Sequence, residues 1–281
     1  MNQFQDALGT WHPLVTYNQP RIVSLVPSLT ELVCDLGLSP YLVGRTGFCI
    51  HPHDTVQRIT KVGGTKDVNI EKIRRLAPTH IIVNIDENEK QCVEELAKFV
   101  PHVIVTHPLV LDDNVALFHL LGGIFNVPQR AQQLVQKFND AKTALQESLP
   151  SPMRQQRVLY CIWKDPWMSV SASTYIADML SQIGWQVSQG DQVRYPVFAW
   201  TKQVVAAIDL ILLSSEPYRF TSKDVDELRR RWGKPVLLVD GEMMSWYGSR
   251  SILGIHYLTQ LRLAETFPVG LPDVEPGRDK A

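Results

Sequence analysis

PQRAQQLVQKFNDAKTALQESL, residues Pro128–Leu149, is the stretch of this chain that decides the fold. Its apolar residues recur at steps of three and four, which places them in one stripe along a helix; they are Leu134, Val135, Phe138, Ala141, Ala144, Leu145 and Leu149. Pro128 suits a first helical turn, Asn126 is a candidate cap, and Pro150 forbids continuation. A helix of this length, roughly 33 Å, is either an ordinary helix of one domain or a strut joining two.

Short β-rich runs alternate with helical patterns on both sides of this stretch, which is typical of α/β proteins with mainly parallel sheets. Before it, strands are predicted at Arg21–Val26, Tyr41–Arg45, His80–Val83 and His102–Thr106, with helices at Ser28–Leu36, Asn69–Leu76, Glu87–Phe99 and Asp112–Phe125. After it, strands are predicted at Arg157–Ile162, Asp209–Leu213 and Pro235–Val239, with helices at Thr174–Ile183, Thr201–Ala207, Lys223–Trp232 and Arg250–Leu263. Ser28 and Glu31 fit a capping box at the start of the first helix.

The two halves share one plan, because NIEKIRRLAPTHIIVN in the first half and WTKQVVAAIDLILLS in the second both predict a helix, a short link and a strand. We therefore expect two Rossmann-like α/β lobes bridged by one long helix. The expected boundaries are an irregular lead-in at 1–20, an N-terminal lobe at 21–127, the bridging helix at 128–149, a C-terminal lobe at 150–267 and a disordered tail at 268–281.

Composition excludes several classes of protein. The 281 residues are 44% hydrophobic and carry a formal net charge of −1, so no electrostatic footprint for nucleic acid exists. No apolar run reaches the roughly 18 residues that span a bilayer. The first twenty residues contain no Lys or Arg, which predicts the absence of a signal peptide and a cytoplasmic location. The alternative is a periplasmic location, if the chain is a processed form.

A ligand site is expected in the loops that follow the strands, because ligands of open α/β sheets bind outside the carboxyl ends of the strands. These loops are rich in aromatic and polar side chains, which suits a flat or bulky ligand. The candidate ligand-binding residues there and in the segment before Thr201 are Phe48, His51, Asn84, Trp163, Trp167, Tyr195, Tyr218, Trp246 and Tyr247. The competing interpretation is that several of these aromatic side chains close the ends of their own lobe.

No known catalytic motif stands out, since the chain has no GxSxG, HExxH, Walker or GxGxxG sequence. Cys49, His51 and His53 alternate, and an extended loop would place their side chains on one side, where thiolate and imidazole could bind a metal ion. A polar loop facing the ligand is the competing interpretation. Glu71 opens a predicted helix, where a carboxylate interacts favourably with the helix dipole.

RIVSLVPSLTEL, VGRTGFCIHP, VGGTKDVNIEKIRRLAP, SSEPYRF and LLVDGEMMSWYGSR together resemble substrate-binding proteins with a helical backbone, which serve ABC importers of cobalamin and ferric siderophores. The resemblance runs from about Arg21 to Leu263 and is nearest to the cobalamin-binding and "helical backbone metal receptor" branch. It implies two α/β lobes bridged by one helix, a ligand held in the cleft between them, and little hinge motion.

In that family an acidic residue on each lobe docks to arginines of the membrane permease. Glu71 matches the first position, whereas Lys202 stands where the second glutamate is expected, and its reversed charge argues against conventional docking. The sequence thus predicts a monomeric, non-catalytic receptor without a tightly bound cofactor, whose ligand is cobalamin-like, haem or a ferric chelate. The alternative is a cytoplasmic corrinoid- or tetrapyrrole-handling protein, or a chelatase that uses Cys49, His51 and His53.

Overall fold

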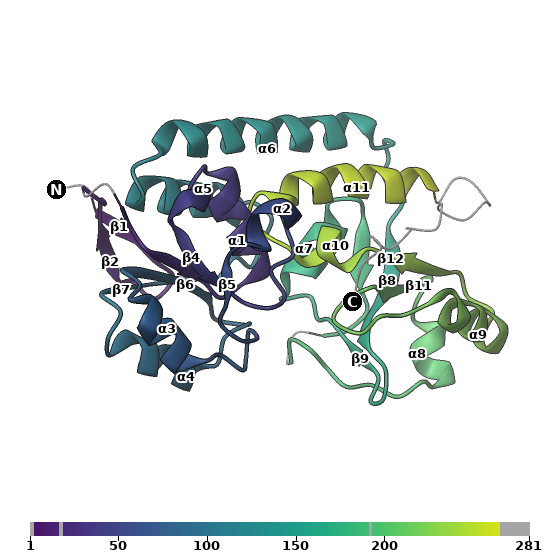
Figure 1. The fold of residues 1–281 in the computed structure, drawn as a ribbon. Coiled ribbons are helices and arrows are strands. Elements are labelled where there is room, and N and C mark those ends of the chain that lie inside the picture. The colour runs from purple at the N-terminus through teal and green to yellow at the C-terminus, as the bar shows by residue number, and fades with distance from the viewer. Residues whose placement is uncertain (1–2, 17–18, 191–192, 265–281) are drawn as a thin grey trace. The chain divides into compact units, whose positions relative to one another are not determined.

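The computed structural model describes residues 3–16, 19–190 and 193–264, which form two compact units (Figure 1). Unit 1 takes the chain up to Pro108, then Asp112–Asn139 and Trp246–Ser251; unit 2 takes Leu109–Leu111, Asp140–Ser245 and the chain from Ile252. The tail that the sequence predicts to be disordered from Pro268 lies outside the described residues.

Unit 1 contains a five-stranded parallel sheet in the order β5-β4-β3-β6-β7. Its strands are β3 (Ile22–Ser24), β4 (Leu42–Arg45), β5 (Thr60–Lys61), β6 (His80–Asn84) and β7 (His102–Thr106). The connecting helices are α1 (Pro27–Asp35), the 3-10 turn η1 (Ser39–Tyr41), α2 (His53–Val56), α3 (Ile70–Leu76), α4 (Lys90–Ala97) and α5 (Asp113–Ile124). The predicted strands are therefore present, and β5, η1 and α2 were not predicted.

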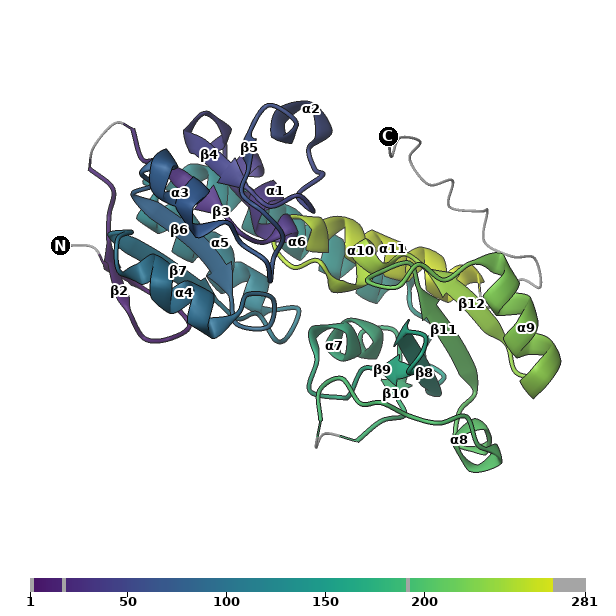
Figure 2. The same ribbon diagram turned by 60° about the horizontal axis from the view of Figure 1, so that its bottom comes forward.

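Alternation along the strands divides the core of unit 1 between two faces. Val23, Ile81 and Val83 pack with Ile73 of α3 and Leu96 of α4 in one buried cluster. Figure 2 shows α3 and α4 together on that side of the sheet. Burial on both faces explains why the central strands β3 and β6 contain consecutive apolar residues instead of an alternation with polar ones.

The residues before β3 fold into a hairpin, where the sequence predicts an irregular lead-in. Strands β1 (Gln3–Gln5) and β2 (Trp11–Pro13) pair in antiparallel fashion. Asp6 fastens the hairpin to β7, because its Oδ2 accepts the Val105 N–H at 3.1 Å. Phe4 packs against Gly123, where an added Cβ would lie 2.1 Å from its ring. Glycine is therefore required at that point of α5.

Three histidines lie close together where the hairpin meets the parallel sheet: His12 of β2, His80 of β6 and His102 of β7. The imidazoles of His80 and His102 stack with ring centroids 4.7 Å apart, and His12 Nε2 lies 3.1 Å from Asp6 Oδ2. His80 is buried, and this burial lowers its pKa from 6.5 to about 3, with smaller contributions from His102 and His12. The folded protein therefore holds His80 neutral.

Helix α1 begins differently from the prediction. Its N-cap is Val26, Pro27 occupies the first turn, and no side chain caps it, so the predicted capping box of Ser28 and Glu31 is wrong. The helix starts directly after β3 because Pro27 favours a first-turn position. Thr30 instead bonds inward, with its Oγ1 2.8 Å from Ser24 Oγ and 2.9 Å from the Val26 carbonyl oxygen.

The long central helix α6 spans Pro128–Ser148, one residue shorter than predicted. Its buried stripe is Ala131, Leu134, Val135, Phe138, Ala141 and Leu145, while Ala144 is exposed. Phe138 meets Phe118 of α5 edge-on at 6.2 Å. An added Cβ on Gly122 would lie 2.4 Å from the Ala131 side chain, so this glycine lets α5 and α6 approach closely. Asn126 adopts a left-handed conformation (φ 57°) two residues before the helix.

Unit 2 contains the parallel strand order β10-β8-β11-β12, with β9 added antiparallel to β8. Its strands are β8 (Gln156–Trp163), β9 (Met168–Ser169), β10 (Trp185–Val187), β11 (Leu210–Ser214) and β12 (Val236–Val239). Its helices are α7 (Tyr175–Ser181), α8 (Lys202–Ala206), α9 (Ser222–Trp232), α10 (Gly241–Ser245) and α11 (Arg250–Ala264). The predicted α/β class with mainly parallel sheets is confirmed, and β9, β10 and α10 were not predicted.

Candidate functional site

The loops at the carboxyl ends of the strands in unit 1 expose apolar side chains. Phe48 and Ile50 follow β4 with 63% and 46% of their surface exposed, and Ile85 follows β6 with 42% exposed. The apolar residues within the strands of this sheet are buried or, in the case of Val43 and Val103, partly buried. Three such side chains in loops of one sheet edge give unit 1 a surface suited to an apolar ligand face.

A short turn after β5 holds Phe48 in place. Gly63 pairs with Val68 in an isolated bridge, and the Gly63 carbonyl oxygen accepts the Gly47 N–H at 2.7 Å. An added Cβ on Gly64 would lie 3.3 Å from the Phe48 ring, so the ring rests directly against this glycine. Phe48 is thus exposed to solvent and yet supported from below.

The loop after β6 is ordered by its own amides. Asn88 Oδ1 accepts the Asn84 N–H at 2.9 Å, and Asn88 Nδ2 donates to the Thr65 carbonyl oxygen at 2.9 Å. Asn84 Oδ1 accepts the Asp86 N–H at 2.8 Å. Asn84, a predicted ligand residue, is buried and shapes this loop. Asn88 has the same role and was not singled out from the sequence, because asparagine is common in loops and its partner at Thr65 lies 23 positions away.

The chain returns to unit 1 at Trp246–Ser251, whereas the sequence predicts that these residues belong to the C-terminal lobe. Arg250 forms a bidentate ion pair with Glu31 of α1, with both N–O distances 2.7 Å. The Gly248 N–H donates to Asn114 Oδ1 at 2.6 Å. The sequence offered no signal for this return, because the Glu31–Arg250 pair spans 219 positions.

Trp246 and Tyr247, both predicted ligand residues, are buried in this segment. The Trp246 ring meets the half-buried His51 ring edge-on at 5.6 Å, and Arg250 Cζ lies 5.1 Å from its centroid. The Tyr247 hydroxyl donates to Glu87 Oε1 at 3.2 Å. The structure thus brings His51 and Trp246 together beside the apolar loops.

Glu87 is the carboxylate with the most perturbed titration at this end of the sheet. Burial raises its pKa from 4.5 to about 7, although the Tyr247 hydrogen bond opposes this shift. The neighbouring Asp86 raises the pKa further, and Lys66 lowers it. Asp86 itself lies 3.4 Å from His107 Nε2. The sequence predicts Glu87 as the first residue of a helix and contains no signal that it belongs to the site.

The structure separates the three residues that the sequence grouped as a possible metal site. Cys49 is buried with its Sγ 3.0 Å from Thr30 Oγ1 and 3.1 Å from Thr46 Oγ1, and burial raises the pKa of its thiol. His53 is exposed on α2, beside Asp54. Among the described residues, no group of three His, Cys, Asp or Glu side chains could hold a metal ion. The alternating loop fails as a chelate because the cysteine points into the core.

Unit 2 carries its own exposed aromatic side chains. Trp163 ends β8 with 39% of its surface exposed and meets the half-buried Tyr218 edge-on at 5.6 Å. Tyr195 is also 39% exposed, with Arg194 Cζ 5.8 Å from its ring. Backbone hydrogen bonds from Ser169 and Ser171 fasten this segment to β9.

Trp167, by contrast, packs inside unit 2. Its ring stacks on Phe220 at 5.5 Å and meets Trp200 edge-on at 5.3 Å. These rings adjoin the core formed by β8, β11 and α9. The competing interpretation, in which aromatic side chains close the end of their own lobe, describes this residue.

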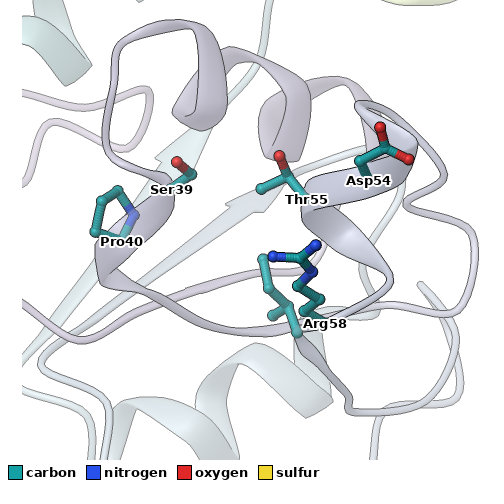
Figure 3. A pocket seen from close by; sticks show the side chains of 6 residues that line it. Ser39, Pro40, Asp54, Thr55 and Arg58 are labelled. Carbon is teal, nitrogen blue, oxygen red and sulfur yellow. The ribbon is translucent and has the colours of Figure 1, made fainter.

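A shallow hollow of about 400 Å³ lies between η1 and α2 and is lined by Ser39, Pro40, Asp54, Thr55, Arg58 and Ile59 (Figure 3). It contains none of the predicted ligand-binding residues. Four of its six lining residues have polar or charged side chains, and Pro40 and Ile59 supply the apolar part of the surface.

Several known proteins are similar to this chain in sequence and in fold. The profile of a family described as periplasmic binding protein matches residues 22–231. The vitamin B12-binding protein of Yersinia pseudotuberculosis serotype O:3 is 21% identical over 254 residues, 89% of this chain and 88% of the relative. The periplasmic vitamin B12-binding protein BtuF of Vibrio cholerae has a TM-score of 0.73 at 19% identity, over 88% of this chain and 98% of that one. The periplasmic heme-binding protein RhuT from Roseiflexus sp. RS-1, in its apo form, has a TM-score of 0.73 at 21% identity with the same coverage.

The family match covers most of the chain, so the protein belongs to the periplasmic binding protein family. This confirms the resemblance and the two-lobed α/β class inferred from the sequence motifs. The relatives are binding proteins by name rather than enzymes. The family description matches the alternative, periplasmic location and gives no support to the cytoplasmic one. Among the described residues, no helix is both long and apolar enough to cross a membrane.

Proposed function

We propose that this protein is the receptor component of an ABC importer and that it binds a cobalamin-like or haem-like metal chelate. The supporting observation is the exposed apolar group Phe48, Ile50 and Ile85 at the carboxyl ends of the strands of unit 1. Large macrocycles present broad apolar faces, which suits such a surface. Relatives that are named for vitamin B12 or heme point to the same ligand class.

Among the nine predicted ligand residues, we propose that the exposed ones make the principal contacts. These are Phe48 in unit 1 and Trp163 and Tyr195 in unit 2. His51 and Tyr218 are half-buried and add smaller contacts. Asn84, Trp167, Trp246 and Tyr247 position loops or other side chains, as their packing indicates.

Titration with cyanocobalamin and with hemin tests the proposed function. We expect at least one of them to bind with a Kd of about 1 µM or tighter, and Phe48→Ala to weaken that binding about tenfold, because a buried aromatic ring contributes roughly 1–3 kcal/mol. Calorimetry measures both values.

The matched control is Leu8→Ala, which removes an equally exposed apolar side chain from the turn of the N-terminal hairpin. This variant should bind cyanocobalamin and hemin with the same affinity as the wild-type protein. Failure of both ligands to bind more tightly than about 1 mM would refute the proposal, because that limit corresponds to only about −4 kcal/mol.

We further propose that Glu71 docks this receptor to its permease and that the protein works in the periplasm. Glu71 is exposed in the first turn of α3, 3.4 Å from Arg74 Nε, and Lys202 is exposed at the start of α8. Glu71→Lys should weaken capture by the permease in nanodiscs several-fold, whereas Lys202→Glu should strengthen it. Equal capture of both variants would contradict docking through these residues. Recovery of the protein only in the cytoplasmic fraction of the native host would contradict the periplasmic location.

No second function is favoured by the structure. A chelatase would require Cys49, His51 and His53 to act on one metal ion, and the structure directs Cys49 into the core and His53 into solvent.

A further inference from the structure

Glu87 occupies an unusual position among the loops of unit 1. The residue is half-buried, follows β6 directly after the exposed Ile85, and accepts a hydrogen bond from the buried Tyr247 on Oε1. A Tyr hydroxyl engaged in this way leaves Oε2 as the oxygen that carries a proton when the carboxyl is neutral. Apart from the bond to Tyr247, none of the ion pairs and hydrogen bonds described above uses this carboxyl group.

Contacts connect Glu87 to the apolar surface of unit 1. Its neighbour Asn88 bonds to the Thr65 carbonyl oxygen in the turn after β5, and the preceding residue, Gly64, supports the Phe48 ring. Lys66, in the same turn, is close enough to act on the Glu87 charge. The carboxyl group therefore belongs to the same end of the sheet as the proposed ligand contacts.

We propose that Glu87 is a specificity-determining residue, which admits ligands bearing carboxylates when it is protonated and disfavours them when it is ionised. The inference rests on the proposed function. A protonated carboxyl can donate a hydrogen bond to a ligand carboxylate, whereas two ionised carboxylates at the same distance repel each other. Ligands without carboxylates lack this dependence.

The charges that face Glu87 set the direction of the effect. The Tyr247 hydroxyl donates a hydrogen bond to Glu87, Asp86 adds negative charge from the same loop, and Lys66 adds positive charge from the turn after β5. His107 lies against Asp86 and partly offsets it when protonated. Burial dominates these contributions and raises the pKa of Glu87 to about 7, so the carboxyl changes from mostly neutral to mostly ionised between about pH 5.5 and 8.5.

Hemin, which has two carboxylates, and cyanocobalamin, whose amide side chains are uncharged, are the probes for a test by calorimetry across this pH range. We expect hemin affinity to fall about tenfold or more from pH 6 to pH 8.5, with cyanocobalamin affinity changing less than about twofold. Glu87→Gln should remove most of the hemin dependence while preserving the size of the side chain. The matched control Glu89→Gln, an exposed carboxylate two residues further on, should retain it.

The outcomes separate this inference from the proposed function. Absence of binding by both probes at every pH overturns the proposed function and with it this inference. Binding of hemin with the same pH dependence in wild-type protein and Glu87→Gln overturns only the role of Glu87. Thermal unfolding without ligand gives a second measurement. Because an ionised Glu87 destabilises the fold, Glu87→Gln should gain melting temperature relative to the wild type at pH 8.5 and gain less at pH 5. An equal difference at both pH values would refute the raised pKa of Glu87.

Discussion

Replacing Arg250 with methionine is expected to lower the free energy of unfolding by about 3–5 kcal/mol. Arg250 and Glu31 are both largely buried, with 7% and 13% of their side-chain surfaces exposed, and they pair at 2.7 Å. The substitution leaves the Glu31 carboxylate buried without its partner, which is far more destabilising than the absence of the whole pair. Chemical denaturation at neutral pH measures the effect.

Two further variants show whether the buried charge is the cause. Adding Glu31→Met to Arg250→Met should restore a large part of the lost stability, since no unpaired charge then remains. Arg74→Met breaks the exposed pair with Glu71 and should change stability by no more than about 0.5 kcal/mol. Equal losses in the single and double variants would show that packing of the arginine stem, rather than the ion pair, stabilises this segment.

Acidification is expected to destabilise the protein through His80. Its pKa is about 3 in the folded protein and 6.5 without perturbation, so the unfolded chain binds more protons between these values. The contribution of His80 is therefore complete above about pH 6.5 and is lost as the pH falls. At pH 4.5, two units below the unperturbed value, the loss should reach about 3 kcal/mol.

Urea denaturation of His80→Leu over the same pH range checks this prediction. The variant should lose stability less steeply with acidification than the wild type, because it has no imidazole to protonate at this position. His119→Leu removes an exposed histidine from α5 and should leave the slope unchanged. An identical slope in wild-type protein and His80→Leu would assign the acid sensitivity to carboxylates elsewhere.

The sequence predicted most regular elements because their signals are local. The stripe from Leu134 to Leu145 repeats at helical spacing, and short strands such as the one at His80–Val83 contain consecutive β-branched residues, here Ile81, Ile82 and Val83. The N-terminal hairpin was missed because its strands have three residues each, which is too short for a periodic pattern. Its stability derives from Asp6 and Phe4, which contact β7 and α5 far along the chain.

The candidate site was only partly predictable for the same reason. Sequence position identified the loops after the strands, including Phe48 and Trp163, because every parallel strand ends at the same edge of its sheet. It did not distinguish the exposed Trp163 from Trp167, which lies four positions further along the chain and packs on Phe220. Exposure depends on neighbours from other elements, and those neighbours have no fixed spacing in the sequence.

By itself, the sequence determined the α/β class, the long helix predicted at Pro128–Leu149 and the family, because these depend on local periodicity and on short sequence motifs. Only the tertiary structure decided that Trp246–Ser251 belongs to unit 1, that Cys49 is a buried thiol, and that Glu87 is held by Tyr247. Each of those facts depends on burial and on partners distant in sequence. Burial, nearby charges and hydrogen bonds set the free energy of a charged or polar group, and only the folded chain brings these neighbours together.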